Sequence, residues 1–434
     1  MNKRTQEIHL EGPERVLVLS GVRGDTRRYR TLHLHQQLRL AGVECALSHT
    51  TDPRLPSLAE GTAVMVLHRV TYDPFVADLI HFVHSRGGFV LADIDDLIFD
   101  PAAFQWIDSP DFQDPLRAAL YQEDMRRHRQ TMEACDAVLA STPYLAQAAR
   151  SLGKPCWVHR NAANLELATI SEQASRSRRP ADGRVVIGYA SGTPTHNRDF
   201  DLASPALQAM LRVHPELELR IIGYLDLDKT WDTFGGRLQR YRPVQWQALP
   251  FWLAQLDVNL APLALNNPFS QSKSEIKYME AALVGVPTLA SRSEAFSAAI
   301  RPGENGLLAD GPDEWLAQLE RLLAPDLRHS LGQAACLDAQ ANYSPQGRAG
   351  QAVELLNEIS ESLKRPFHWQ ASFNPQVDPR RLWWDPELER HPTLTEMALY
   401  TLRHRGAGTL AKQAWIYFRR GLARFVPYGR GSSQ

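Results

Sequence analysis

The stretch Leu260–Ser291 reads LAPLALNNPFSQSKSEIKYMEAALVGVPTLAS. It leaves an apolar run, crosses a polar loop, enters a segment of helical period and exits at Gly285 into a second apolar run. This order predicts a buried strand, a helix that begins at Ser272 or Ser274, and another buried strand. Either serine would cap the helix, and the free N–H groups of a helix start suit a phosphate.

Charged side chains share one face of this predicted helix. Lys273, Lys277 and Glu280 are spaced i, i+4 and i+7, so they lie on the same side. Cations near the helix start would neutralise a diphosphate, and a carboxylate two turns on would accept hydrogen bonds from both hydroxyls of a ribose. A solvated amphipathic helix with a Lys/Glu pair explains the same spacing, so spacing alone leaves both interpretations open.

Apolar runs alternate with helical segments along most of the chain, which predicts parallel sheets with helices on both faces. We expect strands at Arg15–Ser20, Glu44–Ser48, Ala63–Arg69, Phe89–Asp95, Ala137–Ser141, Cys156–Arg160, Val185–Ala190, Leu217–Gly223, Val244–Ala248, Val258–Ala261 and Pro287–Ser291. We expect helices at Tyr29–Ala41, Asp73–Arg86, Leu116–Glu133, Tyr144–Leu152, Leu202–His214, Phe251–Leu256, Ser274–Val284 and Asp313–Leu323.

A polar segment rich in Ser, Arg and Ala, at 165–184, separates two such halves and is typical of a surface linker. We predict Rossmann-like domains at 1–164 and 185–364, with a C-terminal extension at 365–434. With 434 residues the chain is long enough for two domains. Ligands of open α/β sheets bind at the carboxyl ends of the strands, so the predicted site is the cleft between the halves.

Two runs carry a resemblance to a known family: KSEIKYMEAALVGVPTLAS at 273–291 and ENGLLADGPDEW at 304–315. They resemble the donor-binding region of family four retaining glycosyltransferases with the GT-B fold, in the branch common in bacterial surface-polysaccharide loci. The resemblance implies that Glu280 binds the ribose of a nucleotide sugar. The family usually has a second glutamate, on the donor sugar, where this chain has Ser272; Lys273 and Glu275 are the candidates to replace it.

A second cluster, IGYASGTPTHNRDF at 187–200, is predicted to be a buried strand that turns at Gly192 into a helix. A glycine turn lets the backbone approach a phosphate closely, with Thr193, His196 and Arg198 beside it. In the resembling family the corresponding loop meets the diphosphate. A capped strand–helix turn with exposed polar residues is the competing interpretation.

The N-terminal half offers two further candidates. The run SGVRGDTRRYR at 20–30 follows the first strand, and Gly21 and Gly24 suit the loop that lies over the reacting sugar in GT-B enzymes; a basic solvated loop is the alternative. The run VLHR puts His68 and Arg69 at the end of a strand, hence in the cleft; a hydrogen-bonded core histidine explains the same pattern.

The run DIDDLIFD places Asp93, Asp95, Asp96 and Asp100 after another predicted strand. An Asp-x-Asp metal site on a diphosphate is one interpretation. We reject it, because the motif lies in the half opposite the nucleotide site and the resembling enzymes need no metal. We expect Asp95 or Asp96 to hold acceptor hydroxyls or to help deprotonate one, in catalysis with His68. Helix capping and turn formation remain alternatives.

Composition narrows the partners and the compartment. The net charge of −1 gives no global field to attract nucleic acid, and four scattered cysteines lack metal-ligand spacing. No run suits a signal peptide or a membrane span, so we expect a cytoplasmic protein without a resident cofactor. In the tail, Trp415 and Phe418 stand beside Arg419 and Arg420, typical of a helix on an anionic membrane or on the first domain.

Together these features predict a glycosyltransferase that moves a sugar from a nucleotide donor to a glycan or a lipid-linked acceptor. A nucleotide-sugar epimerase-like enzyme on the same fold and a noncatalytic glycan-binding protein are the alternatives. A dinucleotide oxidoreductase is disfavoured, because no G-x-G-x-x-G follows the first strand.

Overall fold

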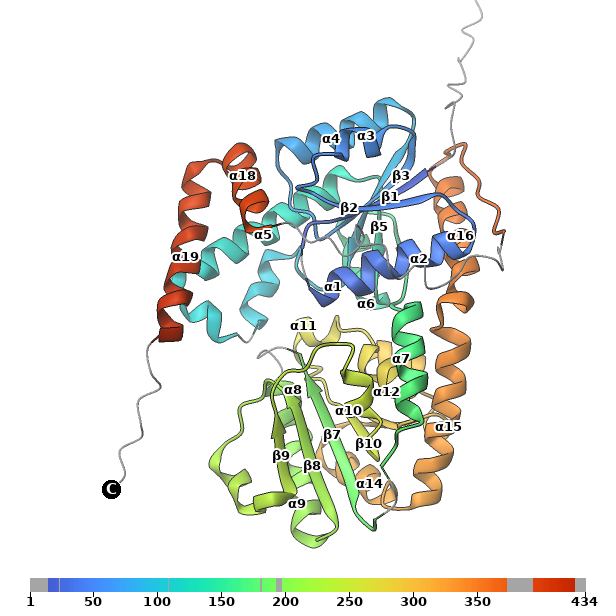
Figure 1. Cartoon of the computed structure of the whole chain (residues 1–434), viewed down its shortest axis with the longest axis vertical. Coiled ribbons are helices and arrows are strands. Elements are labelled where there is room, and N and C mark those ends of the chain that lie inside the picture. Colours follow the sequence, from blue (N-terminus) through green and yellow to red (C-terminus); the bar gives the residue numbers. More distant parts are fainter. Residues whose placement is uncertain are drawn as a thin grey trace, which may run out of the picture.

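The computed structural model describes residues 15–22, 24–107, 109–179, 182–192, 197–372 and 393–425, without the side chains of 417 and 419–425. It consists of two α/β halves, one above the other in Figure 1, with a pair of C-terminal helices beside the upper half. Thr193 and His196 lie outside the described residues.

The first half is built on a parallel sheet of order β2-β1-β3-β4-β5-β6. Its strands are largely apolar and buried, as expected of a parallel sheet with helices on both faces. They are β1 (Arg15–Ser20), β2 (Cys45–His49), β3 (Thr62–His68), β4 (Phe89–Ile94), β5 (Ala137–Ala140) and β6 (Cys156–Val158). The connecting helices are α1 (Asp25–Arg27), η1 (Arg28–Leu32), α2 (His33–Leu40), α3 (Leu55–Ala59), α4 (Pro74–Ser85), η2 (Pro101–Trp106), η3 (Pro110–Gln113), α5 (Pro115–Ala134) and α6 (Pro143–Ser151).

The second half repeats the plan with a parallel sheet of order β12-β11-β10-β7-β8-β9. Its strands are β7 (Val185–Ser191), β8 (Leu217–Gly223), β9 (Leu238–Tyr241), β10 (Val258–Ala261), β11 (Thr288–Ser291) and β12 (Leu307–Ala309). Its helices are α8 (Asn197–Asp201), α9 (Ser204–Val213), η5 (Lys229–Arg237), α10 (Leu249–Leu253), α11 (Pro268–Gln271), α12 (Ile276–Leu283), α13 (Glu294–Ala299), α14 (Gly311–Arg321) and α15 (Pro325–Asn342).

The expected strand at Val244–Ala248 is wrong. The edge strand is β9, which pairs with β8 through Leu238–Tyr241, and residues 244–248 form a turn before α10. β9 reads LQRY and is only partly buried, so it lacks the continuous apolar run that marks the central strands. The short strand β12 also went unpredicted.

The segment predicted as a linker begins with a helix, α7 (Leu165–Ser175). The Asn164 side chain caps it by accepting a hydrogen bond from the Leu167 N–H. Leu165, Leu167 and Ala174 are buried, so one side of this otherwise polar segment packs on the second half.

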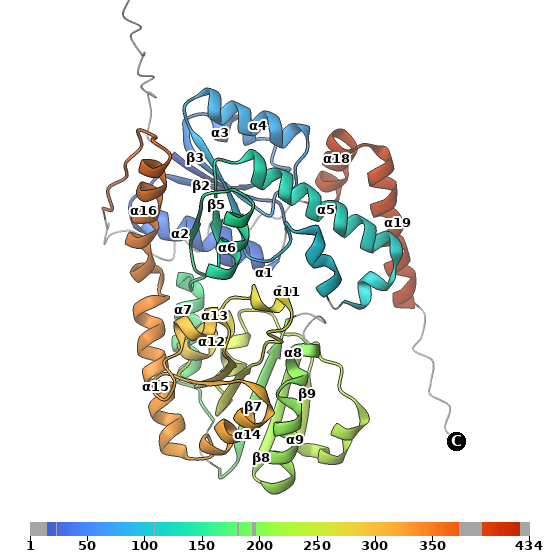
Figure 2. The ribbon, with the colours of Figure 1, turned by 180° about the vertical axis from the view of Figure 1, so that it is seen from behind.

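The first half obtains part of its core from the far end of the chain. After α15, helix α16 (Pro345–Ser362) runs up alongside α2, as Figure 2 shows from behind. Val353 and Leu356 of this helix, with Phe367 and Trp369 beyond it, pack in one cluster with the strand residues of the first sheet. The chain therefore crosses twice between the halves, and both crossings are needed to complete the N-terminal core.

The last described helices, α18 (Leu394–Arg405) and α19 (Ala407–Phe425), form an antiparallel hairpin beside α5. A capping box at Thr393 and Glu396 starts α18. The Tyr400 hydroxyl donates to Asp73 at 2.8 Å, and its ring packs edge-on against Phe75. These contacts hold the hairpin to the first half.

Because α16 closes the N-terminal core, we predict that Leu356→Ala lowers the free energy of unfolding by about 2–5 kcal/mol. Leu356 is 1% exposed. Leu337→Ala on α15 is the matched control, since that side chain is 68% exposed and should cost little. Denaturant unfolding measures both, and equal losses in the two variants would contradict the packing role of α16.

Candidate functional site

Glu280 lies on α12 and contacts the first half directly. The Tyr29 hydroxyl of η1 donates a short hydrogen bond to its carboxylate. Burial raises the pKa of Glu280, while the hydrogen bond from Tyr29 and the charge of Arg28 act in the opposite direction. The carboxylate predicted to bind a ribose is therefore sheltered, and it accepts a hydrogen bond from the Tyr29 hydroxyl of the other half.

Arg28 joins the same contact. Its guanidinium lies 4.2 Å from the centroid of the Tyr29 ring and 4.2 Å from that of the Trp246 ring. The Nε and Nη1 atoms of Arg28 are buried without a hydrogen-bond partner among the described residues. Sequence reasoning did not single out any of the three. Arg28 and Tyr29 lie in the TRRYR run at 26–30, the end of the candidate loop at 20–30, and Trp246 lies in the segment wrongly predicted as a strand.

Lys277 points to the end of β7. Its ammonium donates to the Ala190 carbonyl and lies 4.3 Å from the centroid of the Tyr189 ring. Burial lowers the pKa of Lys277 to about 8. This cation thus lies next to Gly192, where the predicted phosphate loop begins, and Arg198 follows in α8 as an exposed residue.

The predicted cap of this helix is wrong. Helix α12 starts at Ile276, with Glu275 at its N-cap and no side-chain hydrogen bond to the cap. Ser272 instead ends the short helix α11, where its hydroxyl donates to the Phe269 carbonyl at 2.8 Å. The Ser274 hydroxyl accepts from the Asn161 amide at 2.9 Å. Both serines were misassigned because α11 is too short to leave a periodic signal.

Lys273 does not share a helix face with Lys277 and Glu280, as the spacing predicted, because it precedes α12. Its ammonium reaches into the first half and contacts both carboxylate oxygens of Asp96, at 3.0 and 3.1 Å. Glu275 is buried as well, paired with Arg160 at 3.4 Å and accepting from the Tyr343 hydroxyl at 3.2 Å. Segment 272–280 is therefore attached to the N-terminal half at several points.

Asp95 and Asp96 follow β4 and share a cation, Arg69. The Arg69 guanidinium contacts Asp95 at 2.5 Å and Asp96 at 3.3 Å. Burial opposes ionisation of Asp95, but Arg69 outweighs it and lowers the pKa of that carboxyl. Arg69 has φ of 47°, a left-handed conformation that costs a non-glycine residue energy and is concentrated at functional sites.

Gly21 is required by this arrangement. A Cβ atom at Gly21 would lie 2.2 Å from the Arg69 carbonyl oxygen, so the loop after β1 packs backbone to backbone against the turn after β3. Gly24 has φ of 94° and precedes α1. Both glycines thus serve the loop geometry that leads to Arg28 and Tyr29.

His68 and Asp93 form a buried network beneath this surface. Asp93 pairs with Arg30 through two hydrogen bonds of 2.9 and 2.7 Å, and the His68 Nδ1 lies 3.0 Å from the same carboxylate. All three side chains are fully buried. His68 therefore lies under the cleft floor, as the core interpretation of the pattern expected, and Asp100 caps η2.

The carboxylates of the DIDD run do not converge. Asp93 faces Arg30, whereas Asp95 and Asp96 face Arg69. Within the described part of the chain, no three His, Cys, Asp or Glu side chains are grouped as a metal ion would require. Nor does any described helix have the length and apolarity to cross a bilayer.

Comparisons with known proteins agree with this architecture. Residues 201–354 match a family model described as glycosyl transferase-like. Similar solved structures include sucrose-phosphate synthase from Thermosynechococcus elongatus, with 15% identity, a TM-score of 0.54 and coverage of 80% of this chain and 100% of that one. HepE from Anabaena in complex with UDP has 12% identity, a TM-score of 0.55 and coverage of 79% and 100%. A glycosyltransferase from Rickettsia africae has 11% identity, a TM-score of 0.53 and coverage of 80% and 98%.

The fold is thus GT-B, as the sequence predicted. Within this fold, the second half carries the match to the glycosyl transferase-like family model, over residues 201–354. No curated protein matches the chain significantly.

The network beneath the cleft gives a stability prediction. Asp93→Asn removes the charge that compensates the buried Arg30, so we expect a loss of about 3–5 kcal/mol in the free energy of unfolding. Asp310→Asn is the control, because its pair with Arg292 is half-exposed and should contribute little. Denaturant unfolding near neutral pH checks both, and a small effect at Asp93 would show that Arg30 is solvated.

Proposed function

We propose that the chain transfers a sugar from a nucleoside diphosphate to an acceptor hydroxyl, with retention at the anomeric carbon, in polysaccharide or glycoconjugate synthesis. One observation carries the proposal: the Glu280 carboxylate and the Trp246 ring are joined, in the cleft, by Tyr29 and Arg28. A nucleoside presents vicinal hydroxyls to a carboxylate and a flat base to an aromatic ring or a guanidinium. The ribose would replace the Tyr29 hydroxyl on Glu280.

The leaving diphosphate requires positive charge in a sheltered place. Lys277 supplies it at the end of β7, where its ammonium donates to the Ala190 carbonyl, two residues before Gly192. Arg28 contributes two buried, unpartnered N–H groups from the opposite side. Lys273 is engaged by Asp96 in this arrangement of the halves, so its role is to hold the cleft together.

Asp95 and Asp96 act on the acceptor. A carboxylate whose pKa is lowered is a weak base, so Asp95 accepts a hydrogen bond from the acceptor hydroxyl and orients it. Asp96, at the border of the two halves, is the better placed of the two to approach the reacting sugar. His68 is a positioning residue that acts through Asp93.

The donor is a UDP-hexose in this proposal, and the acceptor is a glycan or a lipid-linked glycan at the cytoplasmic face of a membrane. HepE, which shares the fold, was solved with UDP-glucose. The exposed Trp415 and Phe418 of α19 give the chain an apolar surface for peripheral membrane contact.

A thermal-shift panel of UDP, GDP, ADP and dTDP sugars tests the donor. We expect one nucleotide to raise the melting temperature by mass action and Glu280→Ala to weaken its binding about tenfold or more. Donor turnover with acceptor would support transfer. Turnover of donor alone to an epimer would favour the epimerase, and binding without turnover would favour a noncatalytic protein, for which Ser272 in place of the family glutamate is the supporting observation.

Tyr29→Phe is the matched control for Glu280→Ala, because it removes the same hydrogen bond from the other side. If the carboxylate binds the ribose, Tyr29→Phe should leave nucleotide affinity equal or higher, since the ligand no longer competes with the tyrosine hydroxyl. If the hydrogen bond only holds the halves together, both variants should weaken nucleotide binding alike. That result would show that Glu280 does not bind the ribose.

Nucleotide affinity should also depend on pH through Lys277. The pKa of this ammonium is about 8 in the free protein, and the diphosphate binds its charged form. Binding therefore weakens as pH rises from 7 to 9, approaching about tenfold per pH unit above 8. Titration calorimetry measures it. Lys277→Met should bind the nucleotide more weakly, with an affinity that does not change with pH. If the variant keeps the pH dependence of the unmodified chain, Lys277 does not bind the diphosphate.

A further inference from the structure

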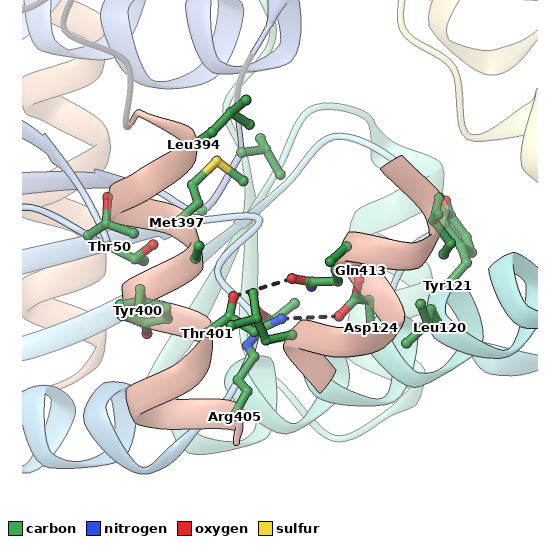
Figure 3. Close-up of a pocket in the computed structure, with 18 of the residues that line it drawn as sticks. Thr50, Leu120, Tyr121, Asp124, Leu394, Met397, Tyr400, Thr401, Arg405 and Gln413 are labelled. Atoms are coloured by element: carbon green, nitrogen blue, oxygen red, sulfur yellow. Dashed lines mark hydrogen bonds and ion pairs between the residues drawn. The ribbon is translucent and has the colours of Figure 1, made fainter. Parts of the chain in front are cut away.

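A large pocket lies outside the Glu280 site, between the carboxyl edge of the first sheet and the C-terminal hairpin. Its volume is about 920 Å³. Figure 3 shows α18 on one side of it, and α19 together with Tyr121, Asp124 and Leu120 of α5 on the other. Bonds between Thr401 and Gln413 and between Arg405 and Asp124 hold its walls together.

The two ends of the pocket differ in chemistry. The hairpin contributes apolar side chains, among them Leu394, Met397, Leu410 and Ile416. The ends of β1 and β2 and the turn after β3 contribute hydroxyls: Ser20, Thr50, Thr51 and Thr71. One end can therefore hold hydrocarbon, and the other can hydrogen-bond to a hydroxylated group.

The polar end adjoins the acceptor carboxylates. Gly21 lines the pocket and packs directly on the Arg69 backbone, while the Arg69 side chain holds Asp95 and Asp96. Tyr121 lines it as well, and burial together with the charge of Asp96 raises the pKa of this phenol. Only Arg69 therefore separates a group bound against Ser20 and Gly21 from the carboxylates proposed to orient an acceptor.

The charges of the pocket are balanced among its described lining residues. Arg117 pairs with Asp111, and Arg405 lies 3.6 Å from Asp124 and 3.8 Å from Asp73. Neither arginine offers an uncompensated charge to an anion. A neutral polar head fits this lining better than a phosphate does.

The apolar end continues onto the surface of the hairpin. Leu394 at the rim is exposed, and on α19 the exposed rings of Trp415 and Phe418 stack at 5.9 Å between centroids. Exposed apolar side chains on the helix that lines an apolar pocket favour contact with a lipid phase.

We propose that this pocket binds the acceptor, and that the acceptor is an amphiphile with an uncharged hydroxylated head and a hydrocarbon chain. The head lies at Ser20, Gly21 and Thr71, and the chain passes between α18 and α19. This rests on the proposed function, because it assigns the pocket to the acceptor of that reaction, and it selects a lipid-like acceptor over a free glycan.

The test is calorimetry of the full chain with alkyl glucosides of increasing chain length, below their micelle concentrations. Affinity should rise by about fourfold for each methylene that the pocket buries, and methyl glucoside should bind least. Ala398→Trp fills the pocket and should abolish this gain. Leu399→Trp is the matched control, because Leu399 lies next along α18, is exposed and does not line the pocket.

The outcomes separate the two proposals. Chain-length dependence that Ala398→Trp removes, with nucleotide binding and melting temperature unchanged, supports the pocket. Equal binding of methyl and octyl glucoside, or equal effects of both tryptophan variants, overturns it and leaves the proposed function standing. Tighter binding of octyl phosphate than of octyl glucoside overturns the uncharged head. If the unmodified chain binds no nucleotide, the proposed function is wrong. The glucoside series still tests the pocket in that case.

Discussion

The Asp96 carboxylate is shared between the two halves of the molecule. Arg69 approaches it from the first half and Lys273 from the second. A partly exposed ion pair of this kind contributes modestly to stability. Asn161 and Ser274 form another polar contact between the halves. Polar seams of this type permit relative domain motion. The contacts of Lys273 with Asp96 and of Asn161 with Ser274 thus hold the halves together through polar groups.

The two crossings of the chain set where such motion can occur. The first crossing enters α7 and the second leaves α15 for α16, and the Ala163 N–H donates to the Tyr343 carbonyl at 2.8 Å where they meet. Because α16 is part of the N-terminal core, the second crossing cannot separate from the first half. The two crossings therefore lie side by side, joined by this hydrogen bond.

Periodicity predicted most of the fold because nearly all strands are continuous apolar runs between turn residues. β1 and β8 were predicted with their observed bounds. β9 was not, since an exposed edge strand has no such run. Glu280 and Lys277 could be singled out from helical spacing, but the partners of Glu280 could not. Tyr29 and Trp246 lie far apart in sequence, and no local pattern reports a contact across a cleft. The start of α12 was predicted wrongly for a related reason. A serine before a segment of helical period suits an N-cap, and only the structure shows that Ser272 is the C-cap of α11.

The side of the cleft proposed to bind the donor and the side proposed to bind the acceptor differ in how firmly they are built. Arg69 is fixed by the close packing of Gly21 on its backbone and by its left-handed conformation, and Asp95 is held by Arg69 within the same half. Opening the cleft breaks the bond of Lys273 to Asp96 and of Tyr29 to Glu280, but leaves Arg69 with both aspartates. In the proposed function, Asp95 and Asp96 keep their contacts with Arg69 when the halves separate, and Glu280 exchanges the Tyr29 hydroxyl for a ribose. Backbone strain at Arg69 is consistent with this division, because a strained residue persists only where the surrounding structure holds it.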